Sequence, residues 1–179
     1  MYLGNTGKKK AELIEGVYYG AEGRQAEVKK IKSFQVAFEG KLNKLRKYTV
    51  DVYQGTLAGV TYYFMHNANF FSINPAAANP SGQGGCYVLN EFGIDEVERF
   101  AFFSKCVYTM LESLTLLPQK NIELPNVLIA NDWHSGALSG LTKYFTLAKV
   151  YAGRLAEDVA RQISAIPVVY IVHHMGYQG

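Results

Sequence analysis

Apolar side chains recur at every second position between residues 33 and 65, which is the spacing of strands that bury one face. Three such runs follow one another along the chain, and they cover Phe34–Phe38, Tyr48–Val52 and Val60–Phe64. Gly55 and Gly59 lie between the last two runs. The pattern therefore predicts three strands, the last two joined as a hairpin with a turn of several residues.

Two segments beside these strands have no apolar periodicity. Residues 1–32 are polar and rich in glycine, and their only helical hint is the stretch 11–17. Residues 72–90 contain Pro75, Pro80 and a cluster of glycines, which favours a loop.

The spacing of apolar residues changes to three and four after residue 95, as in a helix with one buried face. Asp95 is followed three residues later by Glu98, which is close to a capping box at a helix start. Pro118 marks the expected end. The apolar positions between are Phe100, Phe103, Val107, Met110, Leu111, Leu114 and Leu117.

Two short, continuous apolar runs, Val127–Ala130 and Val168–Val172, are typical of strands covered on both faces in a parallel sheet. Helical patterns at 135–147, with Leu138, Leu141 and Phe145 on one face, and at 156–163 separate them. The order strand, helix, strand predicts a βαβ unit. The predicted fold class is α/β, with an antiparallel hairpin beside a parallel sheet.

Composition narrows the class of protein. The chain has 179 residues, 49% of them hydrophobic and 18% charged, so it is expected to form one folded domain rather than a disordered tail. The longest nearly uninterrupted apolar run, residues 165–172, is far shorter than the ~20 residues that span a bilayer. The N-terminal residues lack the apolar stretch of a secretory signal, so we expect a cytoplasmic protein. Cys86 and Cys106 are expected to be free thiols.

Charge is concentrated in the first fifty residues, which hold eleven basic and five acidic side chains, although the whole chain carries only +3. No groove-reading motif accompanies these basic residues. We interpret them as a solvated face and expect neither nucleic acid nor membrane as a partner.

Polar and aromatic residues follow both predicted parallel strands: the first strand runs into Asn131–Gly136 and the second into His173–Gly179. Ligands of open α/β sheets bind outside the carboxyl ends of the strands, so both clusters fall on the functional edge. Asp132 also has a purely structural explanation as a helix cap, and Trp133 as a core residue.

Two chemistries suit this edge. One is a metal site built from Asp132, His134, His173 and His174, although adjacent histidines on an extended backbone point to opposite sides and do not easily share one ion. The other is a sugar or polyol site, in which a carboxylate and imidazoles bind hydroxyl groups and Trp133 offers a flat apolar face. Spacing alone leaves both open.

Four segments, in order from residue 33 to the end, resemble motifs of bacterial glycogen synthases and plant starch synthases. The segment NDWHSG at 131–136 is similar to the family's DWH-T/S/A-G, and HHMGYQG at 173–179 to its HN-L-A-YQG. ERFAFFSK at 98–105 resembles the helix ERFAFFS-R/K, and VTYYF before Asn67 resembles the strand GV-x-x-YF-x-x-N.

The resemblance implies a GT-B glycosyltransferase, in which two Rossmann-like domains face each other across a cleft. It implies transfer of glucose from ADP-glucose or UDP-glucose to the non-reducing end of an α-1,4-glucan, with retention and without a metal or other cofactor. By motif position His173 and Asp132 would be catalytic. Trp133, His134, His174 and Tyr177 would bind substrate.

Departures from the family pattern limit this expectation. The K-x-G-G-L loop that contacts the donor phosphates is absent, as is the C-terminal domain, and His66 and His174 replace a common Asp and Asn. We therefore expect residues 1–179 to be part of an N-terminal domain, inactive alone and partnered by the missing C-terminal domain. The alternative is a non-catalytic glucan-binding or scaffold module.

That partial domain is expected to consist of four regions. They are a poorly defined lead-in at 1–32, strands and a hairpin at 33–71, a loop at 72–90, and a helix with the βαβ unit at 91–179.

Overall fold

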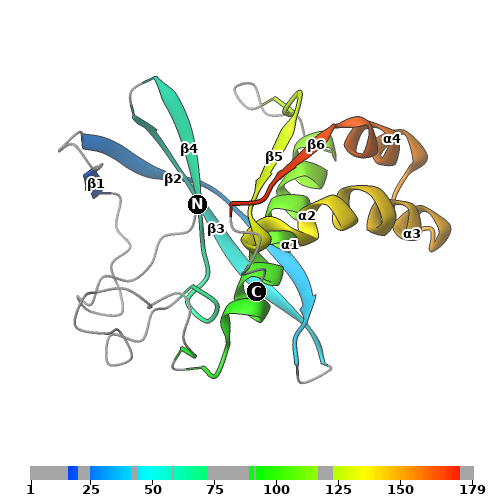
Figure 1. Ribbon diagram of the computed structural model, residues 1–179, viewed down its shortest axis with the longest axis horizontal. Coiled ribbons are helices and arrows are strands. Elements are labelled where there is room, and N and C mark those ends of the chain that lie inside the picture. The colour runs from blue at the N-terminus through cyan, green and yellow to red at the C-terminus, as the bar shows by residue number, and fades with distance from the viewer. Residues whose placement is uncertain are drawn as a thin grey trace. The chain divides into compact units, whose positions relative to one another are not determined.

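The computed structural model describes residues 16–19, 25–41, 44–57, 59–71, 89–90, 92–116 and 123–173 (Figure 1). The chain divides into two compact units, Met1–Arg99 and Phe100–Gly179. They are described in turn.

The first unit contains a four-stranded antiparallel sheet in which each strand pairs with the next one along the chain (Figure 1). The strands are β1 (Gly16–Tyr19), β2 (Gln25–Glu39), β3 (Leu45–Leu57) and β4 (Val60–His66). The three strands predicted from alternation are confirmed as parts of β2, β3 and β4. Each extends further than its apolar run.

A β-bulge between Lys30 and Lys32 divides β2 and changes the face on which its apolar residues lie. Before the bulge, Val28 packs with Tyr53 and Phe64 in one buried cluster. Beyond the bulge, Phe34 pairs with Val50 across the ladder, and Val50 and Tyr53 point to opposite faces because side chains alternate along a strand. Both faces of the sheet therefore bury apolar side chains.

Two expectations for this unit were wrong. Gly55 is not in a turn: it lies inside β3, opposite Val28 and Tyr62. Leu57 and Val60 are register partners, so the connection from β3 to β4 is short, and Gly59 within it has the positive φ of 77° that tight hairpin turns need. The helical hint at 11–17 also fails at Gly16 and Val17, which belong to β1, while 11–15 lie outside the described residues.

The polar residue of the strand motif, Asn67, has a structural role. Its buried side-chain oxygen accepts hydrogen bonds from the backbone N–H groups of Asn69 and Phe70 at 3.0 and 3.2 Å, and its amide donates to the Thr49 carbonyl at 2.8 Å. These bonds fix the turn after β4. Of the loop expected at 72–90, only residues 89–90 are described.

Helix α1 (Glu96–Leu116) begins where the sequence predicts. The Asp95 carboxylate accepts from the Glu98 backbone N–H at 2.9 Å, as an N-cap does. The second half of the capping box is different, because the Glu98 carboxylate accepts from the Lys41 backbone N–H at 3.2 Å. Cys106 is a free, fully buried thiol whose pKa is raised by burial, while Cys86 lies outside the described residues.

The second unit contains a parallel pair, β5 (Leu128–Asn131) and β6 (Val168–Ile171). A continuous run of helical turns and then α4 connect the two strands, so the predicted α/β class with a strand–helix–strand unit is confirmed. The connecting elements are η2 (Trp133–Ser135), α2 (Ala137–Gly140), the π-helix η3 (Leu141–Phe145), α3 (Thr146–Tyr151) and α4 (Glu157–Ala165).

The buried face of these helical turns differs from the predicted one. Leu138 is buried as expected, but Phe145 is 37% exposed, and the fully buried positions are Thr142 and Thr146. Each threonine hydroxyl donates to a backbone carbonyl 3.1 Å away, so these polar side chains are satisfied inside the core. The π-helix adds one residue to a turn and moves the buried stripe off the 3.6-residue pattern.

The prediction that both strands of the parallel pair are buried on both faces was wrong. Ala130 is the only buried residue of the pair, and Ile129, Val169 and Tyr170 are exposed. Among the residues described, no helix is both long enough and apolar enough to cross a membrane.

Candidate functional site

The parallel pairing of β5 and β6 brings the two polar clusters to one edge. Asn131 and Ile171 are register partners, so both strands end at the same level, and Figure 1 shows them side by side. The Asp132 backbone N–H donates to the Ile171 carbonyl at 2.7 Å, one step beyond the ladder. The prediction that Asp132 and His173 follow neighbouring parallel strands at the same edge is confirmed.

Asp132 turns the chain sharply out of β5. Its backbone has φ 60° and ψ −179°, a region that is essentially restricted to glycine, and it is the only non-glycine residue with positive φ in the described part of the chain. Several hydrogen bonds hold this conformation, among them those from the Trp133 N–H to the Asp132 carboxylate at 2.9 Å and from the Ser135 N–H to the Asp132 carbonyl at 3.1 Å. Asp132 is thus also the N-cap of η2, as its structural explanation predicted.

Trp133 and His134 form a half-buried aromatic cluster with Phe100. The Trp133 and His134 rings stack with centroids 4.4 Å apart, and the Phe100 ring meets both at nearly right angles, at 5.1 and 4.5 Å. Burial lowers the pKa of His134, although the Asp132 charge acts in the opposite direction. Burial thus favours the neutral form of His134, and its ring already covers one face of Trp133.

His173 is exposed and hydrogen-bonded to Asn131, with its Nε2 atom 2.6 Å from the Asn131 Oδ1 atom. This contact uses the amide oxygen as the acceptor and Nε2–H as the donor, so Nδ1 is the ring nitrogen left for a ligand. Sequence reasoning assigned no role to Asn131. The signal that would have found it is its position as the last residue of β5, next to the strand that precedes His173.

Two of the predicted substrate-binding residues are not described by the structure. His174 and Tyr177 lie outside the described residues, so no contact of either is known. In the part of the chain that is described, no three histidine, cysteine or acidic side chains gather in a way that would hold a metal ion. The groups that the structure brings together are Asp132, His173 and Asn131, with the Trp133–His134 stack following directly along the chain.

This arrangement defines an α/β protein with a polar and aromatic candidate site at the carboxyl ends of parallel strands. The family described as the starch synthase catalytic domain matches residues 16–179. The chain therefore belongs to the family of glycogen and starch synthase glycosyltransferases.

Individual relatives agree with this assignment. The chain is 29% identical to a glycogen synthase of Oceanobacillus iheyensis over 134 residues, which is 75% of this chain and 20% of that protein. It is 31% identical to a glycogen synthase of Clostridium botulinum over 121 residues, covering 68% and 19%. The chain thus spans about a fifth of the length of these relatives.

Among solved structures, the chain is similar to the catalytic domain of starch synthase IV from Arabidopsis thaliana, which was solved bound to ADP and acarbose. The TM-score is 0.48 at 16% sequence identity, over 84% of this chain and 24% of that one.

The backbone of Asp132 generates a prediction about stability. Glycine should be more stable than alanine at position 132 by about 1–3 kcal/mol, because both variants lose the carboxylate but only alanine keeps a Cβ in the strained region. Urea denaturation of Asp132→Gly and Asp132→Ala measures the difference. The matched pair Gln162→Gly and Gln162→Ala, on the exposed side of α4, should show the ordinary order, with alanine more stable by about 1 kcal/mol. An alanine variant as stable as the glycine variant at position 132 would contradict the strain.

The Asn131 contact generates a second prediction. In neutral His173 the proton should reside mainly on Nε2, and Asn131→Ala should shift the ring toward a mixture of the two tautomers because its acceptor is gone. Asn131→Asp keeps an acceptor oxygen and should preserve the Nε2–H form. Histidine side-chain 15N chemical shifts, assigned with a His173→Gln variant, report the tautomer. Unchanged 15N shifts in Asn131→Ala would show that the contact with Asn131 does not determine the His173 tautomer.

Proposed function

We propose that this chain is part of the N-terminal domain of a glycogen synthase, a retaining GT-B glucosyltransferase with two domains. The complete enzyme transfers glucose from ADP-glucose or UDP-glucose to the non-reducing end of an α-1,4-glucan. The observation that carries the proposal is the convergence of Asp132 and His173 at one edge of the parallel strands, in a chain matched by the family over residues 16–179.

His173 is proposed as the catalytic group at the donor glucose. Positive charge develops on the glucose ring as the nucleotide leaves, and a polar group fixed beforehand stabilises that charge without having to reorganise. The bond to Asn131 supports this role, because it holds the exposed imidazole in one orientation. A flexible histidine would lose part of the benefit in becoming ordered.

Asp132 is proposed as the second catalytic residue, which shapes the sugar site. One carboxylate oxygen accepts from the Trp133 N–H, and an ionised carboxylate has further acceptor positions for a glucose hydroxyl. The turn at φ 60° fixes the direction in which the carboxylate leaves the strand. Trp133 and His134 serve as a rigid wall of the substrate site, and His174 and Tyr177 complete the substrate-binding set that we propose.

The proposed partners are the nucleotide-sugar donor, the glucan acceptor and a C-terminal domain of the same enzyme. No metal or organic cofactor is needed in this scheme, and we place the enzyme in the cytoplasm. Because the chain spans about a fifth of its relatives, most contacts to the nucleotide are expected to come from elsewhere in the complete protein. The donor phosphates are then neither neutralised nor positioned by this chain alone.

The 179-residue chain by itself should therefore be catalytically silent. Incubation of the purified chain with radiolabelled ADP-glucose and glycogen should incorporate no more label than a blank without protein, and UDP-glucose should give the same result. A complete synthase assayed in parallel shows that the conditions support turnover. Clear elongation by the chain alone would contradict the proposal that it is only part of the catalytic apparatus.

In the complete enzyme, His173→Ala should lower kcat by about 10²–10³, the scale for losing one preorganised stabilising donor, with little change in acceptor affinity. His174→Asn restores the residue common in the family, and its kcat should stay near normal if the side chain at position 174 only supports the loop; a collapse would show that the two histidines work differently here from those of the family. Steady-state kinetics on both variants test the assignment.

A near-normal kcat for His173→Ala would show that a different residue stabilises the transition state. If the complete protein retained glucan but transferred no glucose at all, the non-catalytic binding module would be favoured over the enzyme.

A further inference from the structure

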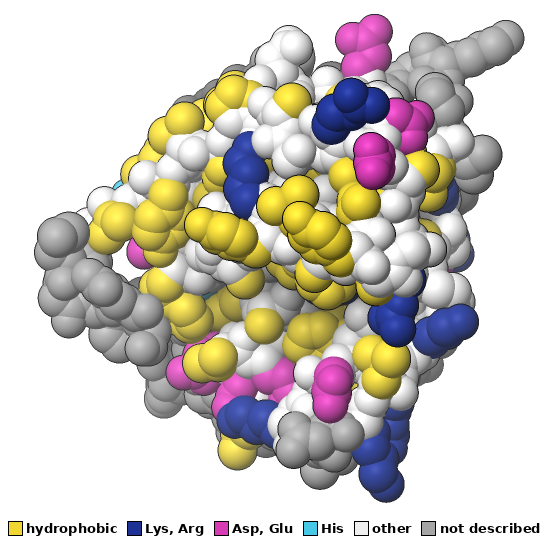
Figure 2. Space-filling model, turned by 90° about the vertical axis from the view of Figure 1, so that its right-hand side faces the viewer, with side chains coloured by type: hydrophobic (Ala, Val, Ile, Leu, Met, Phe, Trp, Pro, Cys, Tyr) yellow, Lys and Arg dark blue, Asp and Glu magenta, His cyan; other side chains and the backbone are white. Residues whose placement is uncertain are grey.

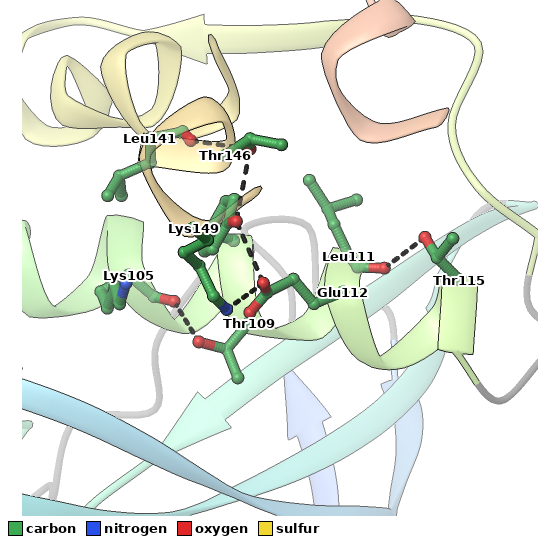
Figure 3. A network of polar contacts seen from close by, with 9 residues as sticks. Lys105, Thr109, Leu111, Glu112, Thr115, Leu141, Thr146 and Lys149 are labelled. Atoms are coloured by element: carbon green, nitrogen blue, oxygen red, sulfur yellow. Dashed lines mark hydrogen bonds and ion pairs between the residues drawn. The ribbon is translucent and has the colours of Figure 1, made fainter. Parts of the chain in front are cut away.

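A buried polar cluster joins α1 to the helical turns η3 and α3 in the second unit, and it shares no residue with the candidate site. At its centre is Glu112, whose buried carboxylate accepts from the Tyr108 hydroxyl at 3.0 Å and forms an ion pair with Lys149. The fully buried Thr146 Oγ1 atom, whose proton goes to the Leu141 carbonyl, lies 3.3 Å from the Tyr108 hydroxyl oxygen. Figure 3 shows Lys149 reaching from α3 to the carboxylate on α1.

Lys105 brings a second ammonium group to the same cluster. Its Nζ atom lies 3.4 Å from the centre of the Phe145 ring and 5.0 Å from that of Tyr108. The Nζ atom of Lys149 lies over the same two rings, at 5.9 Å and 5.7 Å. Two ammonium groups therefore share one pair of rings and one carboxylate, and Lys149 is the one that is bonded to that carboxylate.

Burial and the neighbouring Lys149 ammonium disfavour the charge of Lys105, whereas Glu112 and the two aromatic rings favour it. Burial, with a smaller contribution from Lys149, outweighs Glu112 and lowers the pKa of Lys105 to about 8. At pH 7 roughly a tenth of such amines are neutral, against less than about 0.1% of an ordinary lysine. A neutral amine has a free electron pair and is a nucleophile.

We propose that Lys105 is an acylation site that accepts the acyl group of a small thioester. The Nζ electron pair attacks the thioester carbonyl carbon, the new C–N bond forms, the C–S bond breaks, and the sulfur leaves as a thiolate. The proton lost from nitrogen passes to water. The product amide is uncharged, so Glu112 and Lys149 remain as a pair of equal and opposite charges.

Lys105 is partly exposed and Phe145, whose ring it contacts, is 37% exposed, so the cluster borders the surface of the second unit, where the proposal requires a small donor to reach the amine. Figure 2 shows the face that carries α3 and α4, where hydrophobic side chains gather around isolated charged ones. Acylation would also remove the cation–π contact with Phe145, so the modification changes how α1 and η3 are held together.

Other lysines in the described part of the chain provide internal controls. Lys30 pairs with Asp51 at 2.8 Å and Lys41 pairs with Asp95. In each case a hydrogen bond to the carboxylate raises the lysine pKa, against a smaller lowering by burial. These two amines stay protonated at neutral pH and should react slowly.

The test is acetylation of the full chain by the small thioester S-acetyl-N-acetylcysteamine, with peptide mass spectrometry at several times and at pH values from 6.5 to 10. At pH 7.5 Lys105 should react at least about tenfold faster than Lys30 and Lys41. Its rate should level off just above pH 8, whereas the other two rates should continue to rise. Equal rates, or a Lys105 rate that rises throughout, would overturn the proposal.

A variant of Lys149 tests whether its ammonium group causes the reactivity of Lys105. Lys149→Gln removes the repelling ammonium and leaves Glu112 for Lys105, so Lys105 acetylation at pH 7.5 should fall several-fold. Lys47→Gln removes the same charge from an exposed position on β3 and should leave the rate unchanged. An unchanged rate in Lys149→Gln, with circular dichroism showing that it is folded, would contradict the cluster as the cause. If that variant does not fold, the pH–rate profile of the unmodified chain decides the matter alone.

Discussion

The hydrogen bond from the Asp132 N–H to the Ile171 carbonyl is the interaction on which the candidate site depends. It extends the β5–β6 ladder by one step past the last paired residue and so fixes where β5 stops. The chain turns at Asp132 because its N–H is held there, and Asn131 lies beside His173 because the two strands end together. A parallel pair of four-residue strands thereby positions groups that are more than forty residues apart.

The free-energy cost of this arrangement falls on the backbone of one residue, Asp132. A backbone at φ 60° and ψ −179° costs of order 1–3 kcal/mol in a residue with a side chain, and it persists because the ladder, the η2 cap and the Ser135 contact all support it. Asp132 thus combines the turn out of β5 with the carboxylate that we propose as catalytic, and strained residues of this kind cluster at functional sites.

The sequence predicted those parts of the fold and of the candidate site whose signal lies within one short segment or in the order of the segments. Alternation revealed the strands from Phe34 to Phe64, and strand–helix–strand order brought Asp132 and His173 to one edge. The first part of β2 was missed because its bulge shifts Val28 to the opposite face and exposed lysines surround it. The buried threonines of η3 and α3 were missed because a π-helix is invisible to a 3.6-residue pattern. The role of Asn131 depends on the register between two strands, which one segment alone does not contain.

The two-stranded ladder of the second unit also has a practical consequence. Ile129 and Val169 are register partners and are 61% and 49% exposed, so they present a patch of apolar surface on a short parallel ladder. Surfaces of this kind recruit strands from other molecules when the chain is concentrated or refolding. Replacing one of these two side chains with threonine, which retains β propensity, is the conservative route to a better-behaved sample.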